Sequence, residues 1–365
     1  MKRLLWIDIA KGLAIAFVVY FHFFRTVFEF YEPPPADWNG IAAGTISFLR
    51  GAWWEISGLG FHAVGAFIIL SGWTLTESAL RRASSGTVSW GQWFGGRFVR
   101  LYPMYWVAHL VYLLSPFIAR LEPVDERIVL SLLGLRFINI EMNFMYLNAA
   151  WWYFSMLIQF YLIFPLLFWA ARKFGAWIFL IVACALGFFV RYLMLGVWPQ
   201  NGLWVLGGFA VCRLPEFALG MALGMWHAKS TARAEWFLSR GPALLAGLIL
   251  YPAALWLYDV NYVFVDFATG TCCFLAIVGI AGILSHSGAL AKILGLIGAY
   301  SYGLYLIHQP YVIWLGLRIR PQPILIFFFI FLITLLVLSA WGSVLERTTN
   351  AVVNKLLAKK KTVPA

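Results

Sequence analysis

Apolar runs long enough to cross a membrane follow one another along most of this 365-residue chain. The hydrocarbon core of a bilayer is about 30 Å thick, so a helix that crosses it needs about 20 predominantly apolar residues. Hydrophobic residues make up 62% of the chain, charged residues make up 12%, and the mean hydropathy is +0.83. A water-soluble protein cannot bury that much apolar surface. The sequence therefore predicts an all-α polytopic membrane protein built as a helix bundle.

Counting the runs at about 20 residues each predicts about ten transmembrane helices. The first run lacks a small-residue cleavage site, so we expect it to be retained as a span. Two interrupted, aromatic-rich runs, 41–57 and 128–148, are interpreted as re-entrant or interfacial segments. The ten predicted spans are 6–28, 58–80, 101–120, 151–171, 174–195, 206–227, 241–258, 265–285, 293–316 and 323–344.

The positive charges indicate which way the chain faces. With the N-terminus in the cytoplasm, 17 of the 27 Lys and Arg residues fall on the cytoplasmic side and eight on the other, while Lys11 and Arg213 fall within spans. Cytoplasmic loops of membrane proteins are enriched in Lys and Arg, so we expect an N-in, C-in topology. The same enrichment explains the net charge of +12, so membrane lipids are expected partners and nucleic acid is not. We divide the chain into a membrane domain, 1–345, and a basic cytoplasmic tail, 346–365.

The first span carries three ionisable residues, which are costly inside a membrane and therefore indicate a function. In "IDIAKGLAIAFVVYFHFF", residues 7–24, they are Asp8, Lys11 and His22. In an α-helix, Lys11 and His22 lie about 20° apart around the axis and about 16 Å apart along it. Asp8 lies within about 40° of His22, so all three share one face. The alternative is an interfacial Asp8–Lys11 pair and a histidine buried by ordinary packing.

Two pairs of residues repeat a spacing of three, which places both members on one helix face. Arg97 and Arg100 stand in "GRFVRLYPMYW", at the cytoplasmic start of a predicted span. Two guanidinium groups at this spacing suit a phosphate-bearing ligand, and anchoring at the cytoplasmic interface explains them equally well. Arg213 and Glu216 stand in "RLPEFALGMALG" and predict a buried ion pair, either functional or joining helices.

Small and polar residues mark two further faces. Gly220 and Gly224 form a small-xxx-small pattern, which predicts close packing against another helix. In "SYGLYLIHQPY", Ser301, Tyr305 and His308 share one face, either as polar packing or as part of a site. We expect no metal site and no disulfide, because the cysteines lie in apolar context without a CxxC motif. They are Cys184, Cys212, Cys272 and Cys273.

Together these stretches resemble acyltransferase family 3, whose members O-acylate bacterial surface polysaccharides, lipopolysaccharide O-antigen and lipid-linked saccharides. The first stretch is similar to the family's first helix, in which a basic residue is followed by ten residues and a histidine. Here Lys11 stands where arginine is commoner, and His22 completes the pattern. "FHAVGAFIILSGWTL" resembles the second helix, "RFVRLYPMYW" the paired-arginine segment, and the two remaining stretches the later signatures. The five signatures occur in order over essentially the whole chain.

The resemblance implies an acyl-CoA-dependent O-acyltransferase of the bacterial cytoplasmic membrane. It implies acetyl-CoA as the usual donor and a sugar hydroxyl of a surface or lipid-linked saccharide as the acceptor. His22 is then the catalytic residue, either as a general base or as an acyl carrier, with Lys11 and Asp8 ordering the path beside it. Arg97 and Arg100, together with Lys11, are expected to bind CoA. The expected substrate-binding residues are Arg213, Glu216, Ser71, Tyr305 and His308.

One stretch departs from the family pattern. Many members carry glutamates where this chain has Leu157 and Ile158 in "WWYFSMLIQFYLIFP", so no role of those glutamates is carried over. Gln159, Tyr161 and Pro165 remain. Intramembrane ionisable residues also occur in proton-coupled transporters, which is the alternative function. No inverted repeat supports that alternative. A saccharide-binding scaffold without turnover is a third possibility.

Overall fold

A computed structural model describes residues 4–28, 41–86, 88–118, 123–198, 202–319 and 321–361. Helices account for 87% of these residues, and no strand occurs among them, so the predicted all-α class is confirmed. The helices are α1 (Leu5–Val27), α2 (Ile41–Gly58), η1 (Leu59–His62), α3 (Ala63–Ser84), α4 (Trp90–Leu114), α5 (Arg127–Leu132), η2 (Arg136–Ile138), α6 (Ile140–Met145), η3 (Ala149–Trp151), α7 (Trp152–Phe174), α8 (Ala176–Tyr192), η4 (Leu193–Val197), η5 (Trp204–Gly208), η6 (Ala210–Arg213), α9 (Leu214–Lys229), α10 (Thr231–Leu238), α11 (Gly241–Val260), α12 (Val265–Leu284), α13 (Ala289–Ala299), α14 (Ser301–Gly316) and α15 (Ile324–Lys361).

Seven helices in the described part of the chain are long and apolar enough to cross a membrane. An eighth crossing is possible through α13 and α14, which together pass the same test but meet at a bend of 79°. The predicted spans 101–120 and 206–227 fall on α4 and on η5 to α9, which do not pass it. The count of ten and the N-in, C-in topology therefore stay predictions. The seven helices are Leu5–Val27, Gly44–Ser84, Ala149–Phe174, Ala176–Val197, Gly241–Val260, Val265–Leu284 and Ile324–Ala358.

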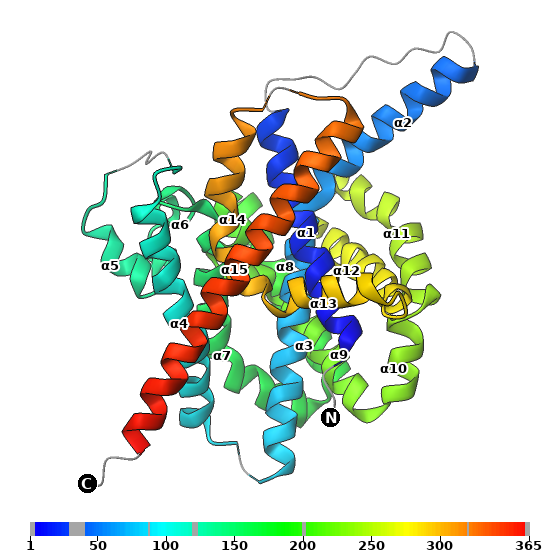
Figure 1. The fold of residues 1–365 in the computed structure, drawn as a ribbon. Coiled ribbons are helices and arrows are strands. Elements are labelled where there is room, and N and C mark those ends of the chain that lie inside the picture. Colours follow the sequence, from blue (N-terminus) through cyan, green and yellow to red (C-terminus); the bar gives the residue numbers. More distant parts are fainter. Residues whose placement is uncertain are drawn as a thin grey trace.

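Two helices are much longer than one crossing. The helix Gly44–Ser84 has 41 residues, so the run 41–57 continues directly into the next span and is not a separate segment. At 1.5 Å per residue it is about 60 Å long, about twice the hydrocarbon thickness. Its first part, α2, extends away from the bundle (Figure 1). The helix α15 likewise continues through the predicted domain boundary between 345 and 346 without a break. The run 128–148 folds into the short helices α5, η2 and α6.

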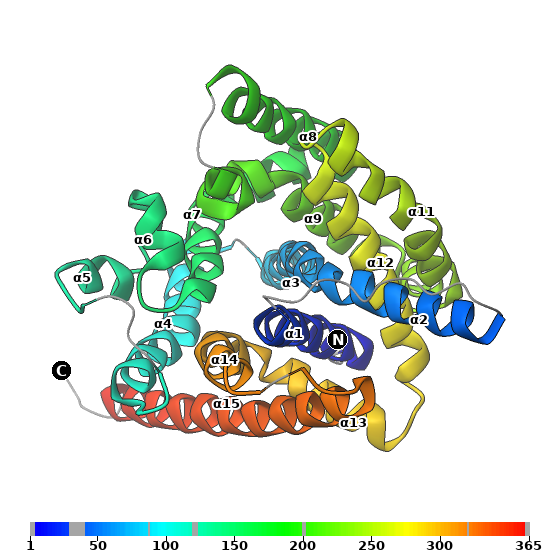
Figure 2. The same ribbon diagram turned by 90° about the horizontal axis from the view of Figure 1, so that it is seen from above.

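Helix α1 is the centre of the bundle. Of the 18-residue apolar stretch of α1, 67% of the residues are buried inside the protein, against 17% for the corresponding stretch of α11 and 22% for that of the helix that contains α8. Seen from above, α1 is enclosed by α2, α3, α13 and α14 (Figure 2). A Cβ atom on Gly298 of α13 would lie 1.7 Å from the carbonyl oxygen of Asp8, so only glycine permits this approach to α1. The polar face of α1 is therefore presented to other helices.

Helices α3 and α9 cross in close contact, as the small residues of α9 predict. A Cβ atom on Gly220 would lie 2.0 Å from the carbonyl oxygen of Ile69, and one on Gly224 would lie 3.1 Å from that of Trp73. The prediction of a small-residue packing face is confirmed. The four cysteines are free, and Cys212, Cys272 and Cys273 are buried as expected.

Candidate functional site

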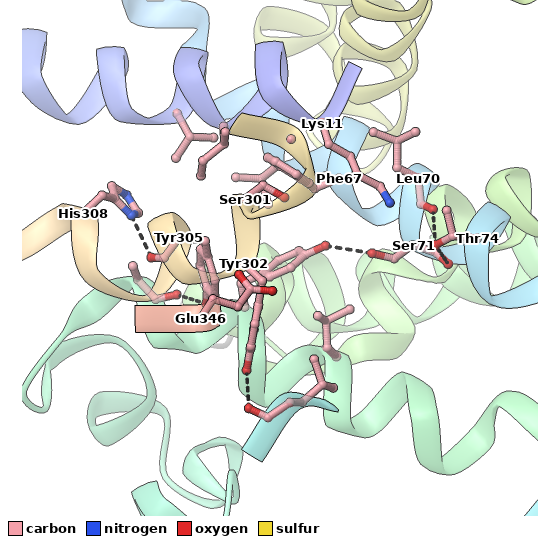
Figure 3. A pocket seen from close by; sticks show the side chains of 18 of the residues that line it. Lys11, Phe67, Leu70, Ser71, Thr74, Ser301, Tyr302, Tyr305, His308 and Glu346 are labelled. Carbon is pink, nitrogen blue, oxygen red and sulfur yellow. Dashed lines mark hydrogen bonds between the residues drawn. The ribbon is translucent and has the colours of Figure 1, made fainter. Parts of the chain in front are cut away.

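A cavity of about 190 Å³ lies beside α1, between α3, α4, α7, α14 and α15. Side chains from α1, α3 and α14 reach toward it (Figure 3). Seven of the ten residues predicted from the sequence line this one cavity, although they come from four different helices. Helix crossing, and not sequence proximity, brings them together. They are Lys11, His22, Ser71, Arg97, Arg100, Tyr305 and His308.

Two histidines face each other at one end of the cavity. The ring centroids of His22, on α1, and His308, on α14, are 5.4 Å apart, with the ring planes tilted by 45°. His22 is half-buried, and its ring forms aromatic contacts but no hydrogen bond with any described residue. His308 is fully buried, and its Nδ1 lies 2.7 Å from the carbonyl oxygen of Tyr305. Two imidazole rings, each able to accept a proton, therefore lie next to each other on the cavity wall.

Two arginines line the same cavity from the first half of α4. A guanidinium N–H of Arg97 donates to the hydroxyl of Ser78 at 2.9 Å, and the group lies 5.2 Å from the ring centroid of Trp93. Arg97 is half-buried, and Arg100, one turn further, is exposed. Neither arginine forms an ion pair with a carboxylate in the described part of the chain. Both guanidinium groups can therefore receive an anion.

The charged groups on the cavity wall are not balanced. The cations are Lys11, Arg97 and Arg100, and the only carboxylate among the lining residues is Glu346 of α15. The two arginines are therefore the cations of the wall that no described carboxylate neutralises. Glu346 also accepts a hydrogen bond from the backbone N–H of Gly303, at 2.9 Å, and so joins α15 to the first turn of α14.

Hydroxyl groups on the cavity wall join neighbouring helices. The hydroxyls of Ser71 and Tyr153 lie 3.2 Å apart and join α3 to α7. The hydroxyl of Tyr305 donates to the carbonyl oxygen of Ala150 and accepts the backbone N–H of Phe154 at 3.1 Å. Tyr305 therefore fixes the start of α7 with the same hydroxyl that was predicted to bind substrate.

Arg213 and Glu216 lie outside the cavity, in a separate group of buried charges. The predicted ion pair is confirmed, with 2.8 Å between Nε of Arg213 and Oε1 of Glu216. Asp266, on α12, lies 3.5 Å from Nη1 of Arg213 and 2.8 Å from Nη1 of Arg191 on α8. We call these four residues the ion cluster. Asp8 is buried and does not line the cavity either.

Sequence reasoning missed several residues of the site. Tyr153 stands in a predicted span among many aromatic residues, and no local pattern separates it from the rest. Glu346 was assigned to the cytoplasmic tail, although an acid within the long apolar helix α15 was a signal that could have been used. Leu157, which replaces a glutamate of many family members, lines the cavity and makes that part of its wall apolar.

Comparison with protein families agrees with this arrangement. The model of acyltransferase family 3, described as an acyltransferase domain, matches residues 4–340, nearly the whole chain. The chain belongs to acyltransferase family 3. The match covers every residue that lines the cavity except Glu346, which lies beyond its end. No curated protein and no solved structure matches the chain. Acyl transfer is the activity of this family, and the cavity is the candidate active site.

The chemistry available in the cavity is that of proton transfer and anion binding. An imidazole takes a proton from a hydroxyl, and guanidinium groups bind phosphate or carboxylate. No group of three His, Cys, Asp or Glu side chains that could hold a metal ion occurs among the described residues.

Proposed function

We propose that this protein is a membrane O-acyltransferase that moves an acyl group, usually acetyl, from acyl-CoA to a sugar hydroxyl. The observation that supports the proposal is that one cavity is lined by the arginine pair Arg97 and Arg100 as well as by His22. Family membership supplies the reaction type, and the cavity supplies groups for both substrates. The acceptor is a surface polysaccharide, O-antigen or lipid-linked saccharide, and the membrane is the bacterial cytoplasmic membrane.

The donor enters from the cytoplasmic end. The 3′-phosphate and diphosphate of CoA are anionic, and guanidinium groups bind phosphate oxygens through two parallel N–H bonds. Because Arg97 and Arg100 form no ion pair with a described carboxylate, they favour an anionic ligand over a neutral one. Lys11, on the same wall, lies between the arginines and His22 in our proposal and contacts the polar groups of the pantetheine arm.

The reaction uses His22 as general base. The imidazole takes the proton of the acceptor hydroxyl while the oxygen attacks the thioester carbonyl carbon. The new ester C–O bond forms, the C–S bond breaks, and the CoA sulfur leaves with the proton that His22 received. A covalent acyl-His22 intermediate is the alternative route, in which the thiol leaves before the sugar arrives.

The direct test is acyl transfer by the purified protein. The protein in lipid nanodiscs is incubated with radiolabelled acetyl-CoA and either a polymeric glycan or a lipid-linked oligosaccharide. We expect label in the glycan that is released by mild alkali, as an O-ester is. Absence of transfer, together with proton-driven uptake of a saccharide into proteoliposomes, would instead support a transporter. Saccharide binding with neither activity would support a scaffold.

The side from which the donor enters is tested by cysteine labelling in cells. Ser85 directly follows α3 and Leu317 directly follows α14, and both are exposed. The C-terminal ends of α3 and α14 point to opposite ends of the bundle (Figure 1). A membrane-impermeant maleimide added outside should label the Leu317→Cys variant in intact cells. It should label the Ser85→Cys variant only after the cells are opened. The opposite result would place Arg97 and Arg100 outside and contradict donor entry from the cytoplasm.

A further inference from the structure

The fully buried ring of His308 has one nitrogen whose role is fixed by its neighbour. Its Nδ1 lies 2.7 Å from the carbonyl oxygen of Tyr305. A carbonyl oxygen only accepts hydrogen bonds, so Nδ1 carries the proton. In a neutral imidazole the other nitrogen, Nε2, then keeps a lone pair and acts as an acceptor.

The acceptor nitrogen of His308 is buried without a partner. No described residue donates a hydrogen bond to Nε2, and the side chain is 0% exposed. A buried polar atom left unsatisfied costs about 1–3 kcal/mol, so such atoms are usually kept for a purpose. The nearest ionisable ring is that of His22, with the centroids 5.4 Å apart.

The separation of the two rings suits a direct hydrogen bond. An N–H···N bond of about 2.9 Å brings two imidazole centroids to about 5 Å, because each nitrogen lies about 1 Å from its ring centre. The observed 5.4 Å is a few tenths of an ångström longer, a difference that a small side-chain rotation of either histidine closes. Neutral His22 always has one N–H to donate.

From this geometry we propose that His308 is the positioning residue for His22. This inference rests on the proposed function, in which His22 is the base. The Nε2 atom of His308 accepts the ring N–H of His22 and so directs the remaining lone pair of His22 toward the acceptor hydroxyl. When His22 takes the hydroxyl proton, its positive charge is shared through the same hydrogen bond.

A neutral histidine suits this place better than a carboxylate does. In hydrolytic triads a buried aspartate orients the catalytic histidine. Inside a bilayer a second buried charge is costly unless it is paired. His308 supplies the same orienting acceptor without a charge, and the carbonyl of Tyr305 keeps it in the required tautomer.

Two substitutions of His308 separate positioning from packing. The amide oxygen of His308→Gln reaches the place of Nε2 and supplies the acceptor for His22. The amide of His308→Asn reaches only the place of Nδ1, so it keeps the bond to the Tyr305 carbonyl and loses the acceptor. A packing role predicts that Asn is tolerated at least as well as Gln, whereas a positioning role predicts the reverse order.

The variants are compared in nanodiscs with acetyl-CoA and a lipid-linked oligosaccharide. We expect His308→Gln to keep kcat within about threefold, and His308→Asn to lower it about tenfold or more, since oriented general bases contribute about 10²–10⁴-fold. The KM for acetyl-CoA should stay unchanged in both. His286→Gln, at an exposed loop position, is the matched control. Equal activity of the two His308 variants, or better activity of Asn, would overturn the inference.

A second measurement does not depend on turnover. In protein labelled with ¹⁵N-histidine, the inference predicts a coupling between ring nitrogens of His22 and His308 across the N–H···N bond, and its loss in His22→Ala. If the coupling between His22 and His308 is observed but the protein transfers no acyl group, the proposed function alone is refuted. Active protein without the coupling, with the two His308 variants alike, would refute the positioning role alone.

Discussion

The cavity and the ion cluster are two polar regions inside the same bundle, and they differ in how their charges are balanced. The ion cluster holds two arginines and two carboxylates in mutual contact, so its charges cancel within the protein. On the cavity wall, Arg97 and Arg100 form no ion pair with a described carboxylate, and the acceptor nitrogen of His308 has no partner among the described residues. Buried groups that satisfy one another hold helices together, whereas groups left over are available to a ligand.

The difference has a physical basis in what each region joins. The cluster links η6 and α9 to α8 and α12, and each of its charges is desolvated, so removing one partner leaves another charge buried alone. The helices around the cavity are joined by neutral hydrogen bonds and by the bond that Gly303 N–H donates to Glu346. The ring of His22 and the Nε2 atom of His308 take no part in such bonds with described residues.

The largest effect is expected from His22→Ala, which removes the proposed base from the cavity. Transfer from acetyl-CoA should fall by about 10²–10⁴-fold, the usual contribution of general base catalysis. The thermal unfolding temperature should change little, because the His22 ring is half-buried and forms no hydrogen bond with a described residue. Normal activity of the variant would show that the cavity is not the catalytic region, in contrast to the proposal.

The opposite response is expected from Asp266→Asn in the ion cluster. Removing one charge from a buried network should destabilise the protein by about 3–5 kcal/mol. Thermal unfolding in detergent should show the loss, while kcat per folded molecule stays near that of the unchanged protein. Glu55→Gln, an exposed acid on α2, is the control and should change stability by less than about 0.5 kcal/mol. A raised KM for the saccharide, with normal stability, would instead support substrate binding by the cluster.

A smaller effect is expected from the double variant Arg97→Ala, Arg100→Ala. The KM for acetyl-CoA should rise about 10- to 100-fold, because a hydrogen bond to a charged group contributes about 1.5–3 kcal/mol and the exposed Arg100 adds little to the contribution of Arg97. Acetyl-pantetheine lacks the CoA phosphates, so the variant and the unchanged protein should use it equally. The double variant Arg172→Ala, Lys173→Ala removes two cations from the end of α7, outside the cavity, and should leave the KM unchanged. If the substitutions raised the KM for acetyl-pantetheine as much as the KM for acetyl-CoA, the proposed binding of the CoA phosphates by Arg97 and Arg100 would be wrong.

The smallest effect is expected from Tyr153→Phe. This change removes only the 3.2 Å hydrogen bond to Ser71 and keeps the ring in place. A neutral hydrogen bond contributes about 0.5–1.5 kcal/mol, so kcat/KM for acetyl transfer should fall by about two- to tenfold. Tyr192→Phe, at an exposed position on α8, serves as the control. A loss as large as that of His22→Ala would assign Tyr153 a direct part in the chemistry.

Local patterns predicted the parts of this protein that depend on a single helix. The length and polarity of the runs predicted the helical class, and the spacing of three predicted the Arg213–Glu216 ion pair. The same reasoning separated the aromatic-rich, interrupted run 41–57 from the span that follows it, whereas the helix continues through Gly58 and Gly60. Glycine lowers helix propensity without forcing a helix to end.

The sequence by itself determined the membrane class, the family, and the helix face that carries Lys11 and His22, because each follows from composition, order or helical periodicity. Only the tertiary structure decided which of the polar residues meet. In the tertiary structure His308 lies opposite His22, and Glu346 lines the cavity. Arg213 and Glu216 lie outside the cavity, in the ion cluster with Asp266. The physical reason is that such pairings depend on where helices cross, and the crossing of α1 with α13 or of α3 with α9 is fixed by close approach at glycines far apart in the chain.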